Sequence, residues 1–389
     1  MFNKFGNIMF WILISIISVL SIPGAVLSQE VINTHTKSAQ SEEPINNNDK
    51  LQYVVAPILG YSTDEGFIIG GLSGITRPDG LILYPYSYYG TTGRIIVKIE
   101  GEVPLRSGFI SGSTAFRRIA RDLYSPVGDG QVIAKATVDR VKTNISFLKS
   151  VSQNVQIGPS LKFDMSQASD IESAEGNPLV IAPDRFIKGS VILLGPQFRY
   201  RTTDTMRPYD GTIISTSILA GRSNSDLFIN PRFDLSADFS AALAKPVSNL
   251  LRFYIRGMTK FQLETPASVR NHMGGESTVR GHLEHRDYGR RLVAGRAQLN
   301  LKTITNWLLP SQIMNKLWDR LPIQPISYET VAFYDAGAVG DPDFGWRKTR
   351  NGFGCGLRVI VPPRIVGHFD IGYSADSGYR IYVGAGETL

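Results

Sequence analysis

The sequence contains one cysteine, Cys355, among its 389 residues. A single cysteine excludes an internal disulfide framework and any cysteine-rich zinc site. We interpret Cys355 as a small hydrophobic side chain that is either buried or in contact with lipid.

Charge clusters and long apolar runs are also lacking. Only 19% of the residues are charged, and the basic residues stand singly although the formal net charge is +7. This pattern argues against nucleic-acid binding. After residue 28 no stretch of about twenty residues is apolar enough for a transmembrane helix. A membrane-spanning structure made by this chain must therefore consist of strands closed into a barrel.

Signatures of catalysis and of metal binding are missing too. No serine stands in a Gly-x-Ser-x-Gly turn, and the glycine-rich segment 353–358 is not followed by a helix, so it is not a phosphate loop. We interpret that segment as a strand in which small residues ease curvature. His282 and His285, with Glu284 and Asp287, have metal-ligand chemistry but lack the helix and third ligand of a zinc motif. We predict no catalytic site, metal or cofactor, and hence no enzyme.

The N-terminus has the pattern of an export signal. Lys4 precedes an apolar run over residues 8–20, and we expect residues 1–28 to be a signal peptide cleaved after Ser28. The alternative, a retained membrane anchor, is disfavoured because the apolar run is shorter than the ~20 residues of a span. Residues 29–50 are polar and have no apolar period, which predicts a disordered periplasmic linker.

The sequence from residue 51 to residue 389 alternates apolar with small or polar positions, and Gly, Pro, Asn and Asp separate the runs. The pattern predicts roughly sixteen strands, an even number as in single-chain outer-membrane barrels. The predicted strands are 51–62, 66–76, 80–90, 93–103, 107–119, 132–149, 155–166, 186–201, 209–221, 232–244, 248–265, 290–305, 327–339, 352–362, 365–374 and 378–387.

A soluble β-sandwich or propeller is the alternative to a membrane barrel. Tyrosines near a strand end, such as Tyr84 and Tyr88, are typical of the aromatic girdles of outer-membrane barrels. Strands as long as 132–149 and 248–265 exceed the five or six residues usual in soluble sheets. No blade repeat is present. We therefore predict an all-β fold, a transmembrane antiparallel barrel over residues 51–389.

Two segments interrupt the strand pattern. Residues 167–185 are acidic and contain proline, which predicts a long outer loop. Residues 306–324 place apolar side chains at helical spacing between Trp307 and Trp318, which predicts a helix on the periplasmic side. That helix either lies in the membrane interface or packs across the periplasmic mouth of the barrel.

The candidate functional segment is Gly274–Arg291, a loop between two long predicted strands that carries Arg280 and Gly281 at its centre. Asp335 stands in the predicted strand 327–339. If the loop folds back into the barrel, Arg280 and Asp335 pair there, with Asp370 as the second candidate partner.

A family resemblance is carried by motifs in a fixed order. Val279, Arg280, Gly281 and His282 form the loop motif, Phe333 to Gly337 read Phe-Tyr-Asp-Ala-Gly, and the segments 352–362 and 368–374 follow. This order resembles the closing half of the BamA/TamA-type outer-membrane assembly and secretion superfamily, which includes the bacterial surface antigen family. Segments 57–70 and 203–212 resemble the first hairpin and a shortened later hairpin of that superfamily, so the resemblance covers residues 51–389.

The resemblance implies a sixteen-stranded barrel whose sixth outer loop folds its Val-Arg-Gly tip into the lumen. By strand count, the loop with Arg280 follows the eleventh strand, and Asp335 lies on the thirteenth. The sequence departs from the pattern at His282, where the superfamily has an aromatic residue. It also lacks a terminal aromatic residue, and residues 29–50 leave no room for POTRA domains.

Two functions follow from this resemblance. In the first, the barrel assists insertion or translocation of proteins or lipids through a weak seam between its first and last strands. In the second, it is a structural anchor or narrow pore that works with a separate periplasmic partner protein. The expected location is the bacterial outer membrane, and the expected partners are lipopolysaccharide, phospholipid and a client polypeptide or lipid, but no nucleic acid.

Overall fold

The computed structural model describes most of the chain beyond the predicted linker. The described residues are 52–63, 65–77, 80–124, 132–173, 188–202, 210–225, 230–284, 286–307, 312, 326–342, 345–346, 349–361 and 365–385. The predicted signal peptide and linker lie outside them, as do His285 and residues 203–209 of the second hairpin motif. Within the described part, no helix is long and apolar enough to cross a membrane.

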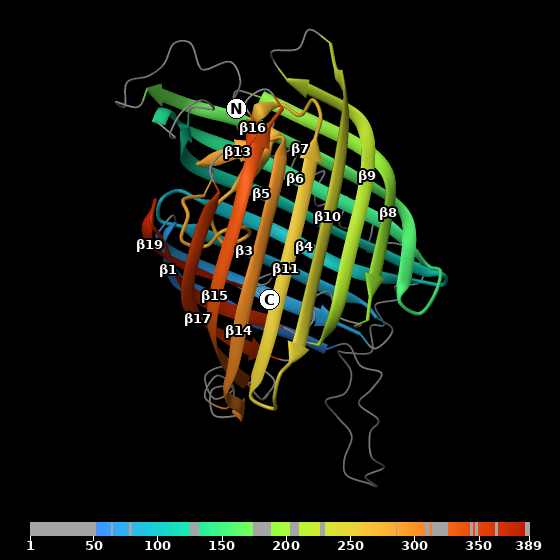
Figure 1. Ribbon diagram of the computed structural model, residues 1–389, viewed down its shortest axis with the longest axis vertical. Coiled ribbons are helices and arrows are strands. Elements are labelled where there is room, and N and C mark those ends of the chain that lie inside the picture. Colours follow the sequence, from blue (N-terminus) through green and yellow to red (C-terminus); the bar gives the residue numbers. More distant parts are fainter. Residues whose placement is uncertain are drawn as a thin grey trace, which may run out of the picture. The chain divides into compact units, whose positions relative to one another are not determined.

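Sixteen antiparallel strands form the barrel (Figure 1). They are β1 (Gln52–Ser62), β2 (Gly66–Thr76), β3 (Ile82–Gly90), β4 (Ile95–Leu105), β5 (Gly108–Tyr124), β6 (Val132–Ser150), β7 (Val155–Ser173), β8 (Lys188–Arg201), β9 (Gly211–Ser225), β10 (Arg232–Pro246), β11 (Leu251–Gln262), β14 (Arg291–Trp307), β15 (Ile326–Asp341), β17 (Arg350–Val361), β18 (Ile365–Ser374) and β19 (Gly378–Ala385). The predicted barrel and its strand count are confirmed.

Alternation along each strand separates an outer apolar face from an inner face. In β8, Val191 and Leu193 are buried inside, whereas Ile192 is 55% exposed and Leu194 60% exposed on the outside. Large apolar side chains are exposed on the outside of most strands. Such a surface suits contact with lipid and not with water. Cys355 is exposed on β17, one position away from the inward glycines 354 and 356.

Two predicted boundaries were wrong. Residues 167–173 are strand and not loop, because β7 runs to Ser173 and pairs with the long β6. There Ala168 packs inward with Ala134 and Ala136 of β6. Residues 306–307 are the end of β14. The rest of the predicted helix at 306–324, apart from Gln312, lies outside the described residues.

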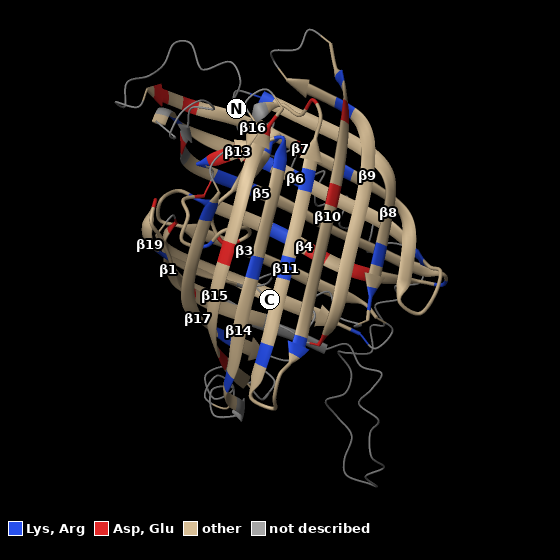
Figure 2. Ribbon diagram, viewed as in Figure 1, with Lys and Arg blue, Asp and Glu red and all other residues tan. Residues whose placement is uncertain are grey.

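The barrel has two ends with different connections. One end carries the turns 63–65 and 91–94 and the longest described connection, residues 263–290 between β11 and β14. Because the loop that carries Arg280 is predicted to be an outer loop, this end is expected to face the outside of the cell. The opposite end carries the turns 106–107, 151–154 and 247–250. Figure 2 shows charged residues distributed along the strands instead of gathered in one patch.

Closure of the sheet is incomplete. Fifteen strand pairs form ladders, from β1–β2 round to β18–β19. A closed barrel of sixteen strands needs one ladder more. β1 and β19 lie side by side, but no ladder joins them within the described residues. We call this junction the seam.

Candidate functional site

The connection 263–290, which we call the lumenal loop, folds into the barrel. It contains the short helix η3 (Ala267–Val269) and a two-stranded sheet of β12 (Asn271–Met273) and β13 (Asp287–Gly289). Its entry is held by Asp234 of β10, which accepts the backbone N–H of Leu263 (3.2 Å) and of Glu264 (2.9 Å). Tyr288 packs into a cradle of small side chains on β6 and β7.

The tip of the lumenal loop is residues 274–284. It closes on itself through Gly275 N–H, which donates to the carbonyl of His282 (2.9 Å), and through Thr278 Oγ1, which bonds both backbone groups of Gly274. Met273 and Val279 lie fully buried against Leu292 and Val339. Gly337 makes room for them, because a Cβ there would lie 3.1 Å from Met273 Sδ and 3.2 Å from Val279.

Arg280 is fully buried and pairs with both aspartates that the sequence singles out. Its Nε donates to Asp335 Oδ2 at 2.8 Å, its Nη2 to Asp335 Oδ1 at 3.0 Å, and its Nη1 to Asp370 Oδ2 at 3.0 Å. The backbone N–H of Arg280 donates to Asp335 as well (3.0 Å). The structure thus brings the predicted partner and the second candidate to the same guanidinium. Its centre also lies 3.4 Å from the ring centroid of Phe333, a cation–π contact.

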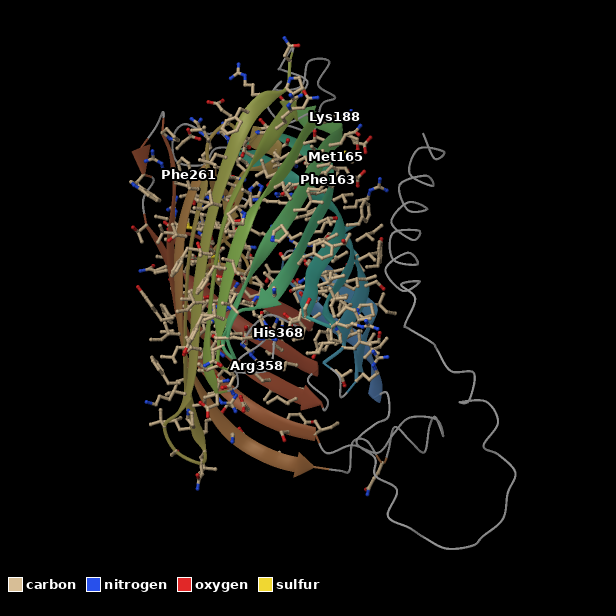
Figure 3. The ribbon with its side chains drawn as sticks, turned by 90° about the vertical axis from the view of Figure 1, so that its right-hand side faces the viewer. Phe163, Met165, Lys188, Phe261, Arg358 and His368 are labelled. Carbon is tan, nitrogen blue, oxygen red and sulfur yellow. The ribbon has the colours of Figure 1, made fainter. Side chains whose placement is uncertain are left out.

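Two further arginines complete this cluster, and the sequence analysis did not identify them. Arg296 of β14 lies 3.1 Å from Asp335, and Arg358 of β17 lies 2.6 Å from Asp370. Both face the lumen, and Figure 3 labels Arg358 and, on the neighbouring strand, His368. Burial disfavours the charged guanidinium, but the two aspartates outweigh it and raise the pKa of Arg280 above its ordinary value. Three cations and two carboxylates therefore share a site closed to water.

Glycines on β17 and β18 make the approach of the tip possible. A Cβ on Gly352 would lie 1.8 Å from the carbonyl oxygen of Arg280, and one on Gly372 would lie 2.7 Å from Gly281 N. Gly281 itself has φ +89°, a backbone conformation that favours glycine. Gly352, which precedes the glycine-rich segment 353–358, and Gly372 on the next strand thus form the floor on which the tip lies.

The tip is also fastened to the last two strands. Tyr382 of β19 accepts the Gly281 N–H at its hydroxyl (3.0 Å), and Ser374 at the end of β18 donates to the Gly281 carbonyl (2.8 Å). Neither residue stands out in the sequence. The one feature of the sequence that could have indicated Tyr382 and Ser374 is that both occupy lumen-facing positions of the final hairpin.

His282 makes a structural contact. Its Nε2 lies 2.9 Å from Asp287 Oδ2, and Arg350 Nε lies 3.1 Å from the same oxygen. Burial alone would raise the pKa of Asp287, but the His282 hydrogen bond and the charge of Arg350 outweigh it and hold the pKa at about 2. No cluster of three or more metal-ligand residues occurs in the described part of the chain.

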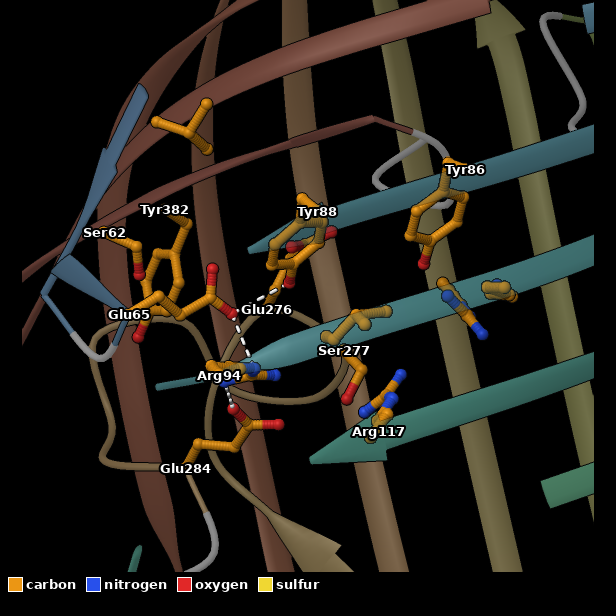
Figure 4. Close-up of a pocket in the computed structure, with 14 residues that line it drawn as sticks. Ser62, Glu65, Tyr86, Tyr88, Arg94, Arg117, Glu276, Ser277, Glu284 and Tyr382 are labelled. Atoms are coloured by element: carbon orange, nitrogen blue, oxygen red, sulfur yellow. Dashed lines mark hydrogen bonds and ion pairs between the residues drawn. The ribbon is translucent and has the colours of Figure 1, made fainter. Parts of the chain in front are cut away.

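A second ion cluster ties the lumenal loop to the first strands. Arg94, which precedes β4, lies 2.9 Å from Glu65 in the β1–β2 turn and 2.7 Å from Glu284 of the tip (Figure 4). Tyr88 of β3 donates to Glu65 at 2.9 Å. The cluster lines a cavity of about 90 Å³ that Tyr382 also borders. Burial raises the pKa of Glu65 to about 7, although the charge of Arg94 opposes this.

The seam runs beside these two clusters. Thr63 N–H donates to the carbonyl of Ile381 (3.1 Å), and Ile381 N–H donates to Thr63 Oγ1 (2.9 Å). Farther along, a Cβ on Gly60 would lie 2.5 Å from Val383. The lumenal loop therefore contacts both sides of the seam, Glu65 through Arg94 on one side and Tyr382 on the other.

Comparison with known proteins gives a match in structure only. No family model matches the sequence, and no curated protein matches it. Among solved structures, CdiB from Escherichia coli is similar with a TM-score of 0.53 and 13% identity, over 90% of this chain and 64% of that one. CdiB from Acinetobacter baumannii gives 0.51 and 12%, over 86% and 65%.

The fold is similar to that of CdiB. BamA from Haemophilus ducreyi lacking POTRA domains 1–3 also matches, with a TM-score of 0.49 and 13% identity over 87% of this chain and 71% of that one. This chain spans about two thirds of the length of the two CdiB chains. The likeness to the two CdiB chains confirms the predicted barrel fold.

Proposed function

We propose that this chain acts in the bacterial outer membrane, where it assists insertion or translocation of proteins or lipids through the seam. The observation that carries the proposal is the contrast between the fifteen strand ladders and the seam. Within the described residues, the hydrogen bonds across the seam are the two between Thr63 and Ile381. An unpaired strand edge is a template on which an incoming strand can add. The role is non-enzymatic.

The neighbouring contacts support a seam that opens. The lumenal loop holds Glu65 beside β1 through Arg94 and holds β19 through Tyr382. A movement of the loop would therefore alter both edges together. The partners that fit this role are a client polypeptide or lipid, the lipids around the barrel, and a periplasmic partner protein that delivers the client.

Locking the seam tests this function. Thr63→Cys with Ile381→Cys, in a Cys355→Ser background, allows a disulfide to join β1 and β19. The control pair is Ile99→Cys with Thr114→Cys, which face each other in the β4–β5 ladder. We expect oxidation of the seam pair, but not of the control pair, to lower the amount of protein or lipid in purified outer membranes. A reductant should restore that amount.

The alternative is a structural anchor that serves a separate periplasmic partner. An outer-membrane composition that stays normal when the seam is locked would contradict the seam mechanism. Recovery of one periplasmic protein with the locked barrel in detergent would then favour the anchor.

A further inference from the structure

The lumenal loop packs against β6–β9 at its own end of the barrel, through Tyr288 and Val269, but it does not fill the lumen beside β4–β9 at mid-height. Inward side chains at mid-height, such as Lys98, Ser113, Lys142, Asn144 and Ser217, are only partly buried. Water therefore reaches this part of the barrel interior.

One carboxylate of β4 makes ionic contacts across this lumen, at the end opposite the lumenal loop. Glu102, 2% exposed, accepts hydrogen bonds from Arg199 and from Arg201 (2.8 Å), both on β8. Arg199 also donates to Ser111 of β5 (2.9 Å), and the Arg201 guanidinium lies 5.2 Å from the Phe109 ring centroid. We call Glu102, Arg199 and Arg201 the lumenal bridge.

The lumenal bridge spans strands that are not neighbours. Three strands separate β4 from β8, and adjacent strands lie about 4.8 Å apart, so the path along the sheet is about 19 Å. Contact between these side chains is thus made across the interior. Further hydrogen bonds continue the bridge at this end, from Ser146 to Ser160 (2.9 Å) and from Gln197 to Ser215 (3.2 Å).

The lumen between the bridge and the lumenal loop carries an excess of positive charge. Lys162 of β7 reaches Ser236 (3.3 Å) and Asp238 (3.7 Å) of β10. Lys142 faces Asp164 across the β6–β7 ladder, and Lys260 faces Asp238 across the β10–β11 ladder.

Arg140 already pairs with Asp164 through two hydrogen bonds. Four cations (Arg140, Lys142, Lys162 and Lys260) thus face two carboxylates, and the bridge adds two arginines against one glutamate. An interior of one sign raises the local concentration of ions of the opposite sign.

We propose that this barrel is a gated pore for small anions, closed by the lumenal bridge. Glu102 of β4 holds the two guanidinium groups of β8 on the other side of the passage. Its loss releases both arginines from β4 and opens a path whose lining attracts anions. This activity is independent of the seam, because none of the bridge residues lies on β1 or β19.

Conductance of the full-length barrel in planar bilayers under a KCl gradient tests the proposal. We expect the wild-type barrel to be mostly closed, and Glu102→Ala to raise the time-averaged conductance several-fold with a reversal potential near that of chloride. The matched control is Glu329→Ala. Glu329 of β15 is also lumen-facing and 2% exposed, but it bonds Arg252 (3.1 Å) of β11 and makes no contact with β8 that the described residues show. This control should leave the conductance unchanged.

Two further variants keep the test decisive. The exchange Glu102→Arg with Arg199→Glu restores opposite charges across the passage and should return the conductance towards the wild-type value. Lys142→Glu added to Glu102→Ala should shift the reversal potential towards that of potassium. If Glu102→Ala fails to give a folded, heat-modifiable band, Glu102→Gln, which removes only the charge, is measured in its place.

The proposal is overturned if the folded Glu102 variant conducts no more than the Glu329 variant. It is equally overturned if the open pore prefers potassium over chloride.

Discussion

The two sides of the lumen differ in what holds their inward side chains in place. Beside β14–β19 a folded loop occupies the interior and excludes water from Arg280, Asp335 and Asp370, all 0% exposed. Beside β4–β9 single side chains meet across a partly hydrated space. The first arrangement fixes one conformation because every buried charge has a partner there, and Arg280 loses both of its aspartates if the loop leaves. The second depends on one carboxylate and can open without moving the backbone.

The largest effect is expected from Arg280→Ala. In this variant Asp335 still pairs with Arg296, and Asp370 still pairs with Arg358, but neither aspartate is linked to the lumenal loop. Breaking a buried ion pair lowers the free energy of unfolding by about 3–5 kcal/mol. We expect loss of heat-modifiability in SDS and protease cleavage within 263–290. Asp335→Ala should behave similarly, and the double variant should be less destabilised than the sum of the two, because both remove one interaction. Additive losses would show that the two side chains are not coupled.

Glycine substitutions beneath the tip come next. Gly352→Ala places a methyl group 1.8 Å from the Arg280 carbonyl, so the tip must shift; overpacking of this kind costs about 1–3 kcal/mol. The matched control is Gly257→Ala on β11, where nothing lies within 4 Å of the new Cβ. Protease accessibility of the lumenal loop should rise for the first variant only. Equal accessibility in both would mean that the tip does not lie on β17.

Tyr382→Phe should have a smaller effect. It removes the hydroxyl that accepts the Gly281 N–H, and a typical hydrogen bond contributes about 0.5–1.5 kcal/mol. Hydrogen exchange of the tip amides should accelerate while the urea midpoint of the whole barrel changes little. A large drop in that midpoint would assign Tyr382 to the stability of the seam instead of the tip.

The pH dependence at Glu65 is the smallest effect. Burial raises the pKa of Glu65 from 4.5 to about 7 in the folded protein. Between these two pH values folding takes up a proton, so the contribution of Glu65 to the free energy of unfolding decreases as the pH rises from about 4.5 to about 7. Glu65→Gln should reduce the difference in urea midpoint between pH 5 and pH 8. An unchanged difference would show that Glu65 titrates normally.

Parts of the site were predictable because their signals are local. The position of the Arg280 loop after the eleventh barrel strand, and of Asp335 on the thirteenth, follow from counting runs of alternating residues. Arg296, Arg358 and Tyr382 were not predictable in the same way. Each is one polar residue among many at lumen-facing positions, and only the contact with the tip distinguishes it.

The sequence by itself determined the sixteen strands and the face that each side chain takes, because alternation with a period of two is read within a single strand. The tertiary structure decided which lumen-facing residues meet. The contacts of Arg280 with Asp370 and of Glu102 with Arg199 join strands that are far apart along the chain. The distance between such residues depends on the curvature of the sheet and on the path of the loop inside the barrel. The alternation along a single strand contains no information on either.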